Sequence, residues 1–130
     1  MKIFSLECGE NVIKSLSNML GSPASGVVFG LGALTYAKLK VYDLKTKKYQ
    51  EKEFKGNLEV CSFIATVSKD DNNQTFLHPH IVITSSDFAT VGGHLEEGIV
   101  GATFEAMFFE SDQVVKREFN KEIGLNLIKK

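Results

Sequence analysis

The apolar run LEVCSFIATV, at residues 58–67, constrains the fold of this 130-residue chain more than any other stretch. Its apolar side chains hardly alternate with polar ones. A strand with this pattern is typically covered on both faces, so we expect it in the middle of a sheet. Cys61, inside the run, is expected to be a core residue.

Turn signals on both sides of this run predict antiparallel neighbours. KDDNNQ, at residues 69–74, favours a tight turn because Asp and Asn tolerate left-handed geometry, and FLHPHIVIT (76–84) then forms the second arm of a hairpin. The turn lacks the glycine and glutamate spacing of an EF-hand, which argues against calcium. Residues 34–42 and 49–54 predict another hairpin, and Gly56 is expected to end its second strand.

The ends of the chain carry the other elements. Residues 2–6 predict a first strand, and Glu10 or Asn11 begins a helix whose apolar side chains repeat every three or four residues. Gly21, Ser22 and Pro23 end that helix.

The C-terminal third continues the β pattern. Residues 99–111 predict a long strand, with residues 114–119 as its partner across a short turn. The tail, residues 122–130, is expected to add a short strand or a helical turn.

The glycines of SGVVFGLGAL, at residues 25–34, resemble a phosphate-binding loop. Such a loop must lead from a strand into a helix, whereas a β-rich run follows here. We therefore expect these glycines to serve a bend or a close subunit contact.

Composition narrows the class of protein. With 43% hydrophobic residues, the chain can bury one ordinary core, so we expect a single domain over residues 1–130. It shows no signal peptide and no apolar run of about 20 residues, so we expect a soluble, cytoplasmic protein without a membrane partner. Cys8 and Cys61 lack the spacing of a thiolate metal site.

A net charge of −1 provides no overall positive field for nucleic acid. The one basic concentration is the hairpin at residues 34–54, where lysines alternate with tyrosines. This pattern fits a nucleic-acid surface, but also a solvated edge that uses lysine to prevent aggregation. Glu51 and Glu53 lower the net positive charge of this hairpin.

All three histidines of the chain lie within residues 76–98. The two-residue period of a strand puts His78 and His80 on one face, roughly 7 Å apart at Cα. His94 follows Gly92 and Gly93, which allow a tight turn or a close backbone approach, and it would add a third nitrogen. Three imidazoles with a position left for water make an open zinc-type site.

The alternative is that the histidines are separate polar residues on a half-exposed strand and loop. Pro79 has no N–H for the ladder, so the segment should lie at a sheet edge or an irregular point. A site that binds a ligand has to be open in the same way.

Residues 78–109, HPHIVITSSDFATVGGHLEEGIVGATFEAMFF, resemble the core of the PPC domain. This module is shared by prokaryotic proteins of unknown function and plant AT-hook nuclear proteins. FSLECGENVIKSLSNML (4–20), GVVFGLGALTYAKLKVYD (26–43) and GNLEVCSFIATVS (56–68) resemble its other elements, so the likeness covers nearly the whole chain.

The resemblance implies an α/β domain of the α+β type, with a mainly antiparallel sheet, one N-terminal helix packed on it and assembly as a homotrimer. It also implies a metal ion held by the positions of His78, His80 and His94. This chain departs from the family in having Pro79 between the paired histidines, and it has no AT-hook, so we expect no tight binding to nucleic acid. We therefore expect a trimeric, zinc-binding protein with room for a small-molecule ligand at the metal.

Two other functions stay open. A metal-dependent hydrolase would need an acid or base beside the metal, for which Glu96, Glu97 and Glu105 are the candidates. A regulatory or DNA-binding interaction module would need DNA-binding parts that this sequence lacks.

The assembly expectation also has a physical basis. An exposed sheet edge has to be covered, and the glycine-rich segment together with FEAMFF (104–109) offers apolar surface for a cyclic interface. Such an interface could bring a neighbouring subunit's side chain to the metal. A monomer whose FEAMFF run fills its own core is the alternative.

Overall fold

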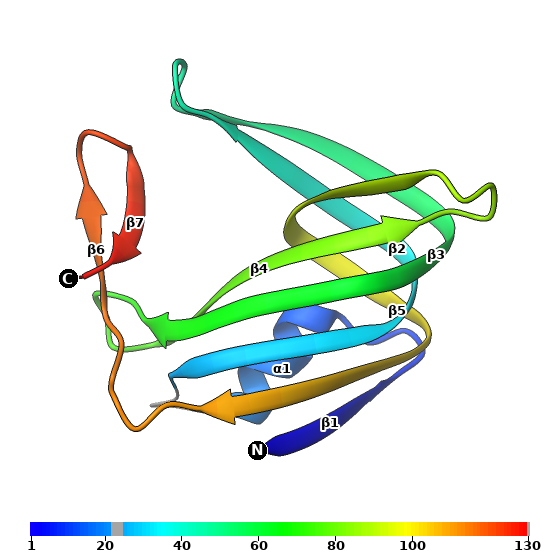
Figure 1. Ribbon diagram of the computed structural model, residues 1–130, viewed down its shortest axis with the longest axis horizontal. Coiled ribbons are helices and arrows are strands. Elements are labelled where there is room, and N and C mark those ends of the chain that lie inside the picture. The colour runs from blue at the N-terminus through cyan, green and yellow to red at the C-terminus, as the bar shows by residue number, and fades with distance from the viewer. Residues whose placement is uncertain (22–24, 130) are drawn as a thin grey trace.

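The computed structural model describes residues 1–21 and 25–129, which form a mainly antiparallel sheet with one helix packed on it. The elements are β1 (Lys2–Glu7), α1 (Val12–Leu20), β2 (Gly26–Asp43), β3 (Lys48–Lys69), β4 (Thr75–Thr84), β5 (Thr90–Glu110), β6 (Arg117–Asn120) and β7 (Leu125–Ile128). The main sheet has the order β1-β5-β2-β3-β4, and β4 also pairs with β5, so these strands curl round until β2, β3, β4 and β5 close on themselves (Figure 1). The predicted fold class is confirmed.

The helix forms where the sequence predicts it. Asn11 caps its N-terminus, because its side chain accepts a hydrogen bond of 3.1 Å from the Lys14 backbone N–H. The helix buries Val12, Leu16 and Leu20 in the core, and it lies behind the sheet in the view of Figure 1. The predicted stop at Gly21 agrees, while Ser22 and Pro23 are outside the described residues. No helix in the described ranges is long and apolar enough to cross a membrane.

The central position of the apolar run is confirmed, since β3 lies between β2 and β4. Its expected burial on both faces is wrong for the single chain. Phe63 and Ala65 are buried, whereas Ile64 is 47% exposed and Cys61 is exposed rather than in the core. Buried and exposed side chains alternate along β3. The sequence does not show this alternation, because the exposed side chains are apolar as well.

The sheet therefore has an inner face, which packs on α1 and the core, and an outer face, which carries Ile64. β3 also runs through Gly56 without a break, contrary to the expected end of the strand there. Gly56 has a φ of +112°, a conformation that glycine adopts without a Cβ clash, so the strand continues through an irregular point.

The pairing expected for residues 114–119 is wrong. Arg117–Asn120 pairs with Leu125–Ile128 in a separate two-stranded sheet, which confirms a strand in the tail. The C-terminal half of β5 already pairs with β1 on one edge and with β2 on the other. No free edge is left there for another strand, so the chain continues past β5.

Candidate metal centre

The three histidines meet on the outer face of the sheet. His78 and His80 alternate along β4 with buried neighbours, and His80 lies directly opposite His94 on β5. One ligand nitrogen from each ring lies within 4.8 Å of the others, and the ring centroids are 5.0 to 5.8 Å apart. We call these residues the histidine cluster.

The cluster lies where the sheet is only partly paired, as the proline between the two histidines predicts. β4 pairs with β3 from Thr75 onwards, whereas its pairing with β5 begins at His80. Pro79 therefore lies in a part of β4 that has one pairing partner, β3, among the described strands. This leaves one side of the cluster open.

Gly92 and Gly93 bring the backbones together beside His94. A Cβ at Gly92 would lie 3.0 Å from the Ile81 carbonyl oxygen, and a Cβ at Gly93 would lie 3.0 Å from the Lys40 carbonyl oxygen. The glycines thus serve a close approach of β5 to β4 and β2. The reversal between β4 and β5 occurs earlier, at residues 85–89.

The electrostatics of the cluster favour the neutral form of His78 and His94. Burial, and then the charges of the two neighbouring histidines, lower the pKa of His94 to about 4. Burial, followed by the charges of Arg117 and His80, also lowers the pKa of His78. A neutral imidazole has a free nitrogen lone pair, which is the form that binds a metal ion.

The His94 ring shows that the cluster fits a metal. Its Nδ1 is buried and has no hydrogen-bond partner within the part of the chain that the structure describes. A buried polar atom without a partner is costly, and coordination would satisfy it. Ligand nitrogens around a tetrahedral zinc are about 3.4 Å apart for bonds of about 2.05 Å, so modest ring movements would close the site.

A second charged group, the lysine cluster, lies next to the histidines on the outer face. Lys38 and Lys40 contact Glu51 at 2.8 and 3.2 Å, and Lys40 contacts Glu96 at 2.8 Å. Hydrogen bonds from Lys38 and then Lys40 hold the pKa of Glu51 below its usual value. Since Lys40 lies opposite His94, the two clusters share a border.

The structure does not gather the three glutamates named from the sequence at the histidines. Glu96 is near His94 but is ion-paired with Lys40. Glu97 accepts a hydrogen bond of 3.3 Å from the Asn11 amide. Glu105 lies about eleven residues further along β5 than His94 and opposite Leu31.

One residue beside the cluster was missed from the sequence. Arg117, on β6, donates a hydrogen bond of 3.0 Å to Thr66, which lies opposite His78. It is the only arginine among fifteen basic residues, and this was the signal that could have singled it out.

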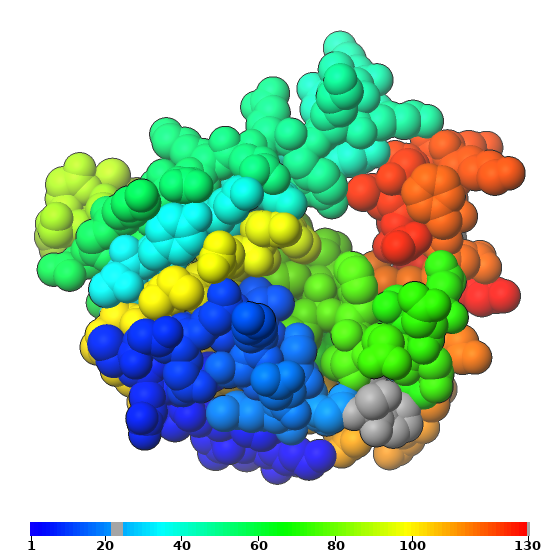
Figure 2. Space-filling view, turned by 180° about the vertical axis from the view of Figure 1, so that it is seen from behind, coloured from blue at the N-terminus to red at the C-terminus, as the bar shows by residue number. Residues whose placement is uncertain are grey.

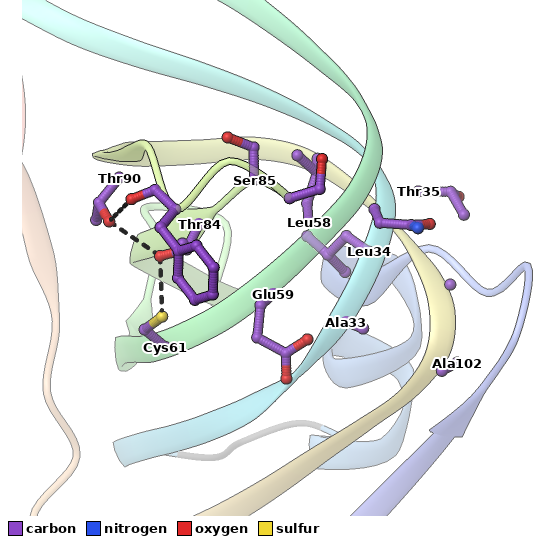
Figure 3. Close-up of a pocket in the computed structure, with 14 residues that line it drawn as sticks. Ala33, Leu34, Thr35, Leu58, Glu59, Cys61, Thr84, Ser85, Thr90 and Ala102 are labelled. Atoms are coloured by element: carbon purple, nitrogen blue, oxygen red, sulfur yellow. Dashed lines mark hydrogen bonds between the residues drawn. The ribbon is translucent and has the colours of Figure 1, made fainter.

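A separate cavity of about 810 Å³ lies near the other end of β4 (Figure 3). The Cys61 thiol and the hydroxyls of Thr84 and Thr90 form a chain of contacts in it, at 3.1 and 3.0 Å. Phe88 at its rim is 87% exposed. This is where the cysteine expected in the core lies.

The comparisons with known proteins agree with this fold. The sequence profile described as the Plants and Prokaryotes Conserved (PCC) domain matches residues 2–112. A search of curated proteins finds no match.

Three solved structures are similar over almost the whole chain. A candidate DNA-binding protein from Bacteroides thetaiotaomicron is 28% identical with a TM-score of 0.92, and the match covers 98% of this chain and 90% of that one. A metal-containing protein from Archaeoglobus fulgidus is 26% identical with a TM-score of 0.89, covering 99% and 92%. A plant- and prokaryote-conserved protein from Pyrococcus horikoshii is 25% identical with a TM-score of 0.89, covering 99% and 90%.

Proposed function

This chain belongs to the Plants and Prokaryotes Conserved domain family, and from that premise we propose that it is a homotrimer that binds zinc at the histidine cluster. The observation that carries the metal proposal is the geometry of the cluster. Three ring nitrogens, one from each histidine, lie within 4.8 Å of one another, and a buried nitrogen of His94 has no hydrogen-bond partner among the described residues.

The donor set favours zinc over harder cations. Imidazole suits zinc and its first-row neighbours, whereas calcium and magnesium prefer oxygen ligands. The similar protein from Archaeoglobus fulgidus is described as metal-containing, which supports a metal here without identifying it.

A zinc ion in the cluster would supply a Lewis acid with a coordination position open to a ligand. His78, His80 and His94 would hold the ion, and the close approach at Gly93 fixes β5, which carries His94, against β2. A general base is less evident. Glu96, the candidate carboxylate nearest to His94, is ion-paired with Lys40, so we do not extend the proposal to hydrolysis.

Metal analysis tests the metal proposal directly. We expect protein purified without an affinity tag and supplied with zinc to contain about one zinc per chain by plasma mass spectrometry. His94→Ala should lose most of it, whereas Glu105→Gln, on the same strand but away from the cluster, should keep it. Wild-type protein without stoichiometric metal after zinc addition would refute the proposal.

The trimer proposal rests on the apolar outer face of the sheet. Exposed apolar side chains gather there from all five strands of the main sheet, at fractional exposures between 37% and 70%: Ile3, Phe29, Leu31, Ile64, Val82 and Phe109. A contiguous patch of this kind on a single chain marks an interaction surface. Ile64 lies opposite His80, so a subunit packed on this face would border the open metal position.

Light scattering coupled to size exclusion tests the assembly. We expect a trimer mass for the wild-type protein across dilution, and a monomer mass for Ile64→Glu, because the variant buries a charge at the interface. Val114→Glu is the matched control, since Val114 is 56% exposed on the segment after β5. A wild-type monomer would contradict the trimer.

A further inference from the structure

Arg117 is a buried cation without an acidic partner. It is 7% exposed, and none of the ion pairs in the described ranges 1–21 and 25–129 includes it. Its Nε and Nη2 donate to the hydroxyls of Ser68 and Thr66, at 2.8 and 3.0 Å, and its Nη1 donates to the Asn126 carbonyl at 2.9 Å. Buried charges in proteins are normally paired with an opposite charge, so this guanidinium lacks a counter-ion.

The acidic side chains that line the same hollow as Arg117 do not take that role. Asp70, Asp71 and Glu118 line it, but none of them forms an ion pair with the guanidinium, and Glu118 is instead paired with Lys129 at 3.4 Å. Asp70 Oδ1 instead accepts hydrogen bonds from the backbone N–H groups of Asn72 and Gln74.

The guanidinium lies beside the histidine cluster. It stacks over the Phe76 ring at 4.9 Å, and Phe76 precedes His78 by two residues on the same strand. Thr66, to which it is bonded, lies directly opposite His78.

The β2–β3 and β6–β7 hairpins lie next to each other with a gap between them. The tip of the β2–β3 hairpin is joined to the β6–β7 turn by a hydrogen bond of 2.7 Å from the Tyr42 hydroxyl to the Ile123 carbonyl. Figure 2 shows a hollow between these hairpins, drawn in teal and in red-orange, with the green β4 at its base. A small molecule can therefore approach the outer face of β4 between them.

We propose that Arg117 and the metal ion together bind a small carboxylic acid, whose carboxylate pairs with the guanidinium while one of its oxygens occupies the open metal position. The inference rests on the proposed metal site. A guanidinium has five N–H donors, and the three bonds above leave one on each terminal nitrogen. Two such donors match the two oxygens of a carboxylate.

The charge balance favours an anion over a neutral ligand. A divalent ion on three imidazole ligands, which contribute no negative charge, next to a guanidinium without an acidic partner, would give the site an excess positive charge that a carboxylate offsets. Lys40, the cation opposite His94, is already neutralised by Glu51 and Glu96. Arg117 lies outside residues 2–112, which match the family profile.

Cobalt-loaded protein gives a readout that does not depend on activity. We expect glycolate to change the visible absorption of the bound Co²⁺ in the wild-type protein, and glycolamide, its neutral analogue, to have little effect. Arg117→Gln should weaken glycolate binding about 10- to 100-fold, as expected for the loss of charge-assisted hydrogen bonds. Arg117→Lys, which keeps the charge, should lose less, and Lys40→Gln should bind glycolate like the wild type.

A second measurement separates this role from a purely structural one. Without glycolate, Arg117→Gln should hold Co²⁺ at least as tightly as the wild type, because a like charge beside the metal is removed. Loss of Co²⁺ from Arg117→Gln and Arg117→Lys alike would mean that Arg117 only supports the fold, and would overturn the inference.

The remaining outcomes are equally decisive. Equal glycolate affinity in the wild type and Arg117→Gln, equal responses to glycolate and glycolamide, or tighter binding of inorganic phosphate would each overturn it. So would a wild-type protein that binds Co²⁺ but not glycolate, for instance because a neighbouring subunit's carboxylate fills the site. If the wild type does not bind Co²⁺ at all, the proposed metal site itself fails.

Discussion

The lysine cluster and the histidine cluster with Arg117 are adjacent on one face of one sheet, yet they differ in how their charges are satisfied. Each cation of the lysine cluster has a carboxylate within 3.2 Å. Beside the histidines, by contrast, Arg117 has no acidic partner in the part of the chain described. The buried Nδ1 of His94 has no hydrogen-bond partner there. The charges of the first cluster are paired within the folded chain, whereas the second has buried groups that a bound ligand would satisfy.

This difference has a structural cause. The lysine cluster is built across a hairpin and its neighbouring strand, where opposite charges face each other at Lys40 and Glu51. The histidine cluster is built where β4 loses one pairing partner and β6 contributes an arginine from a distant part of the sequence. Concentrated charge alone therefore does not mark a binding site, whereas unsatisfied buried groups do.

The largest expected effect is the response of stability to zinc. At about 1,000 times the dissociation constant, a bound ligand stabilises the folded state by about 4 kcal/mol, which should raise the Tm of the metal-free protein by roughly 10–20 °C. His80→Ala should abolish this rise, and Glu51→Gln, in the lysine cluster, should keep it. Differential scanning calorimetry with and without zinc measures both. If both variants lost the zinc-dependent rise in Tm equally, the proposed difference between the two clusters would be wrong.

The next effect is a pH dependence of the metal-free protein. The pKa of His94 is about 4 in the folded protein against 6.5 ordinarily, so between these values the unfolded chain takes up a proton that the folded chain does not. Stability should be fully present above pH 6.5 and fall as the pH drops to about 4. Allowing for solvent screening at this partly open site, we expect a loss of about 1–2 kcal/mol.

Urea denaturation at several pH values measures this slope. His94→Asn removes the titrating ring and should flatten the profile over that range by the same amount. If the variant retains the wild-type slope, the burial of His94 is not the cause.

A smaller effect is expected from breaking the lysine cluster. Glu51→Gln removes the carboxylate shared by Lys38 and Lys40, but these groups are partly exposed, so the cost should be below about 1 kcal/mol. Added salt should reduce the difference from the wild type further. A loss of several kcal/mol in chemical denaturation would show that the lysine cluster is more than a screened surface network.

The smallest expected effect concerns nucleic acid. Because Lys38 and Lys40 already have carboxylate partners, the lysine cluster has few charges left to neutralise phosphates, and we expect weak or no DNA binding at ~150 mM salt. A gel-shift assay with duplex DNA checks this. Tight, sequence-selective binding would contradict it and would give weight to the similarity with the candidate DNA-binding protein.

Much of the fold and of the site followed from local patterns. The spacing of apolar residues located α1 and its Asn11 cap, and the two-residue period put His78 and His80 on one face. Pro79 correctly indicated an incompletely paired part of the sheet. These features depend on neighbours within a few residues, which the sequence records directly.

Features that depend on contacts between residues far apart in the sequence were harder to predict. The partner of residues 114–119 depended on whether β5 still had a free edge, and both of its edges there were already taken. Cys61 was expected in the core because the outer face of β3 is as apolar as the inner one, so composition could not distinguish the two faces.

The sequence by itself singled out the three histidines as the candidate site, since they are the only ones in the chain and two of them share a strand face. Only the tertiary structure decided that His94 lies opposite His80, and that Arg117 reaches the same surface. Strand register and the course of the chain after β5 result from pairing between residues far apart in sequence. The two-residue alternation of side chains along a strand shows which face of the sheet a residue occupies. It does not show which residue of the neighbouring strand lies opposite.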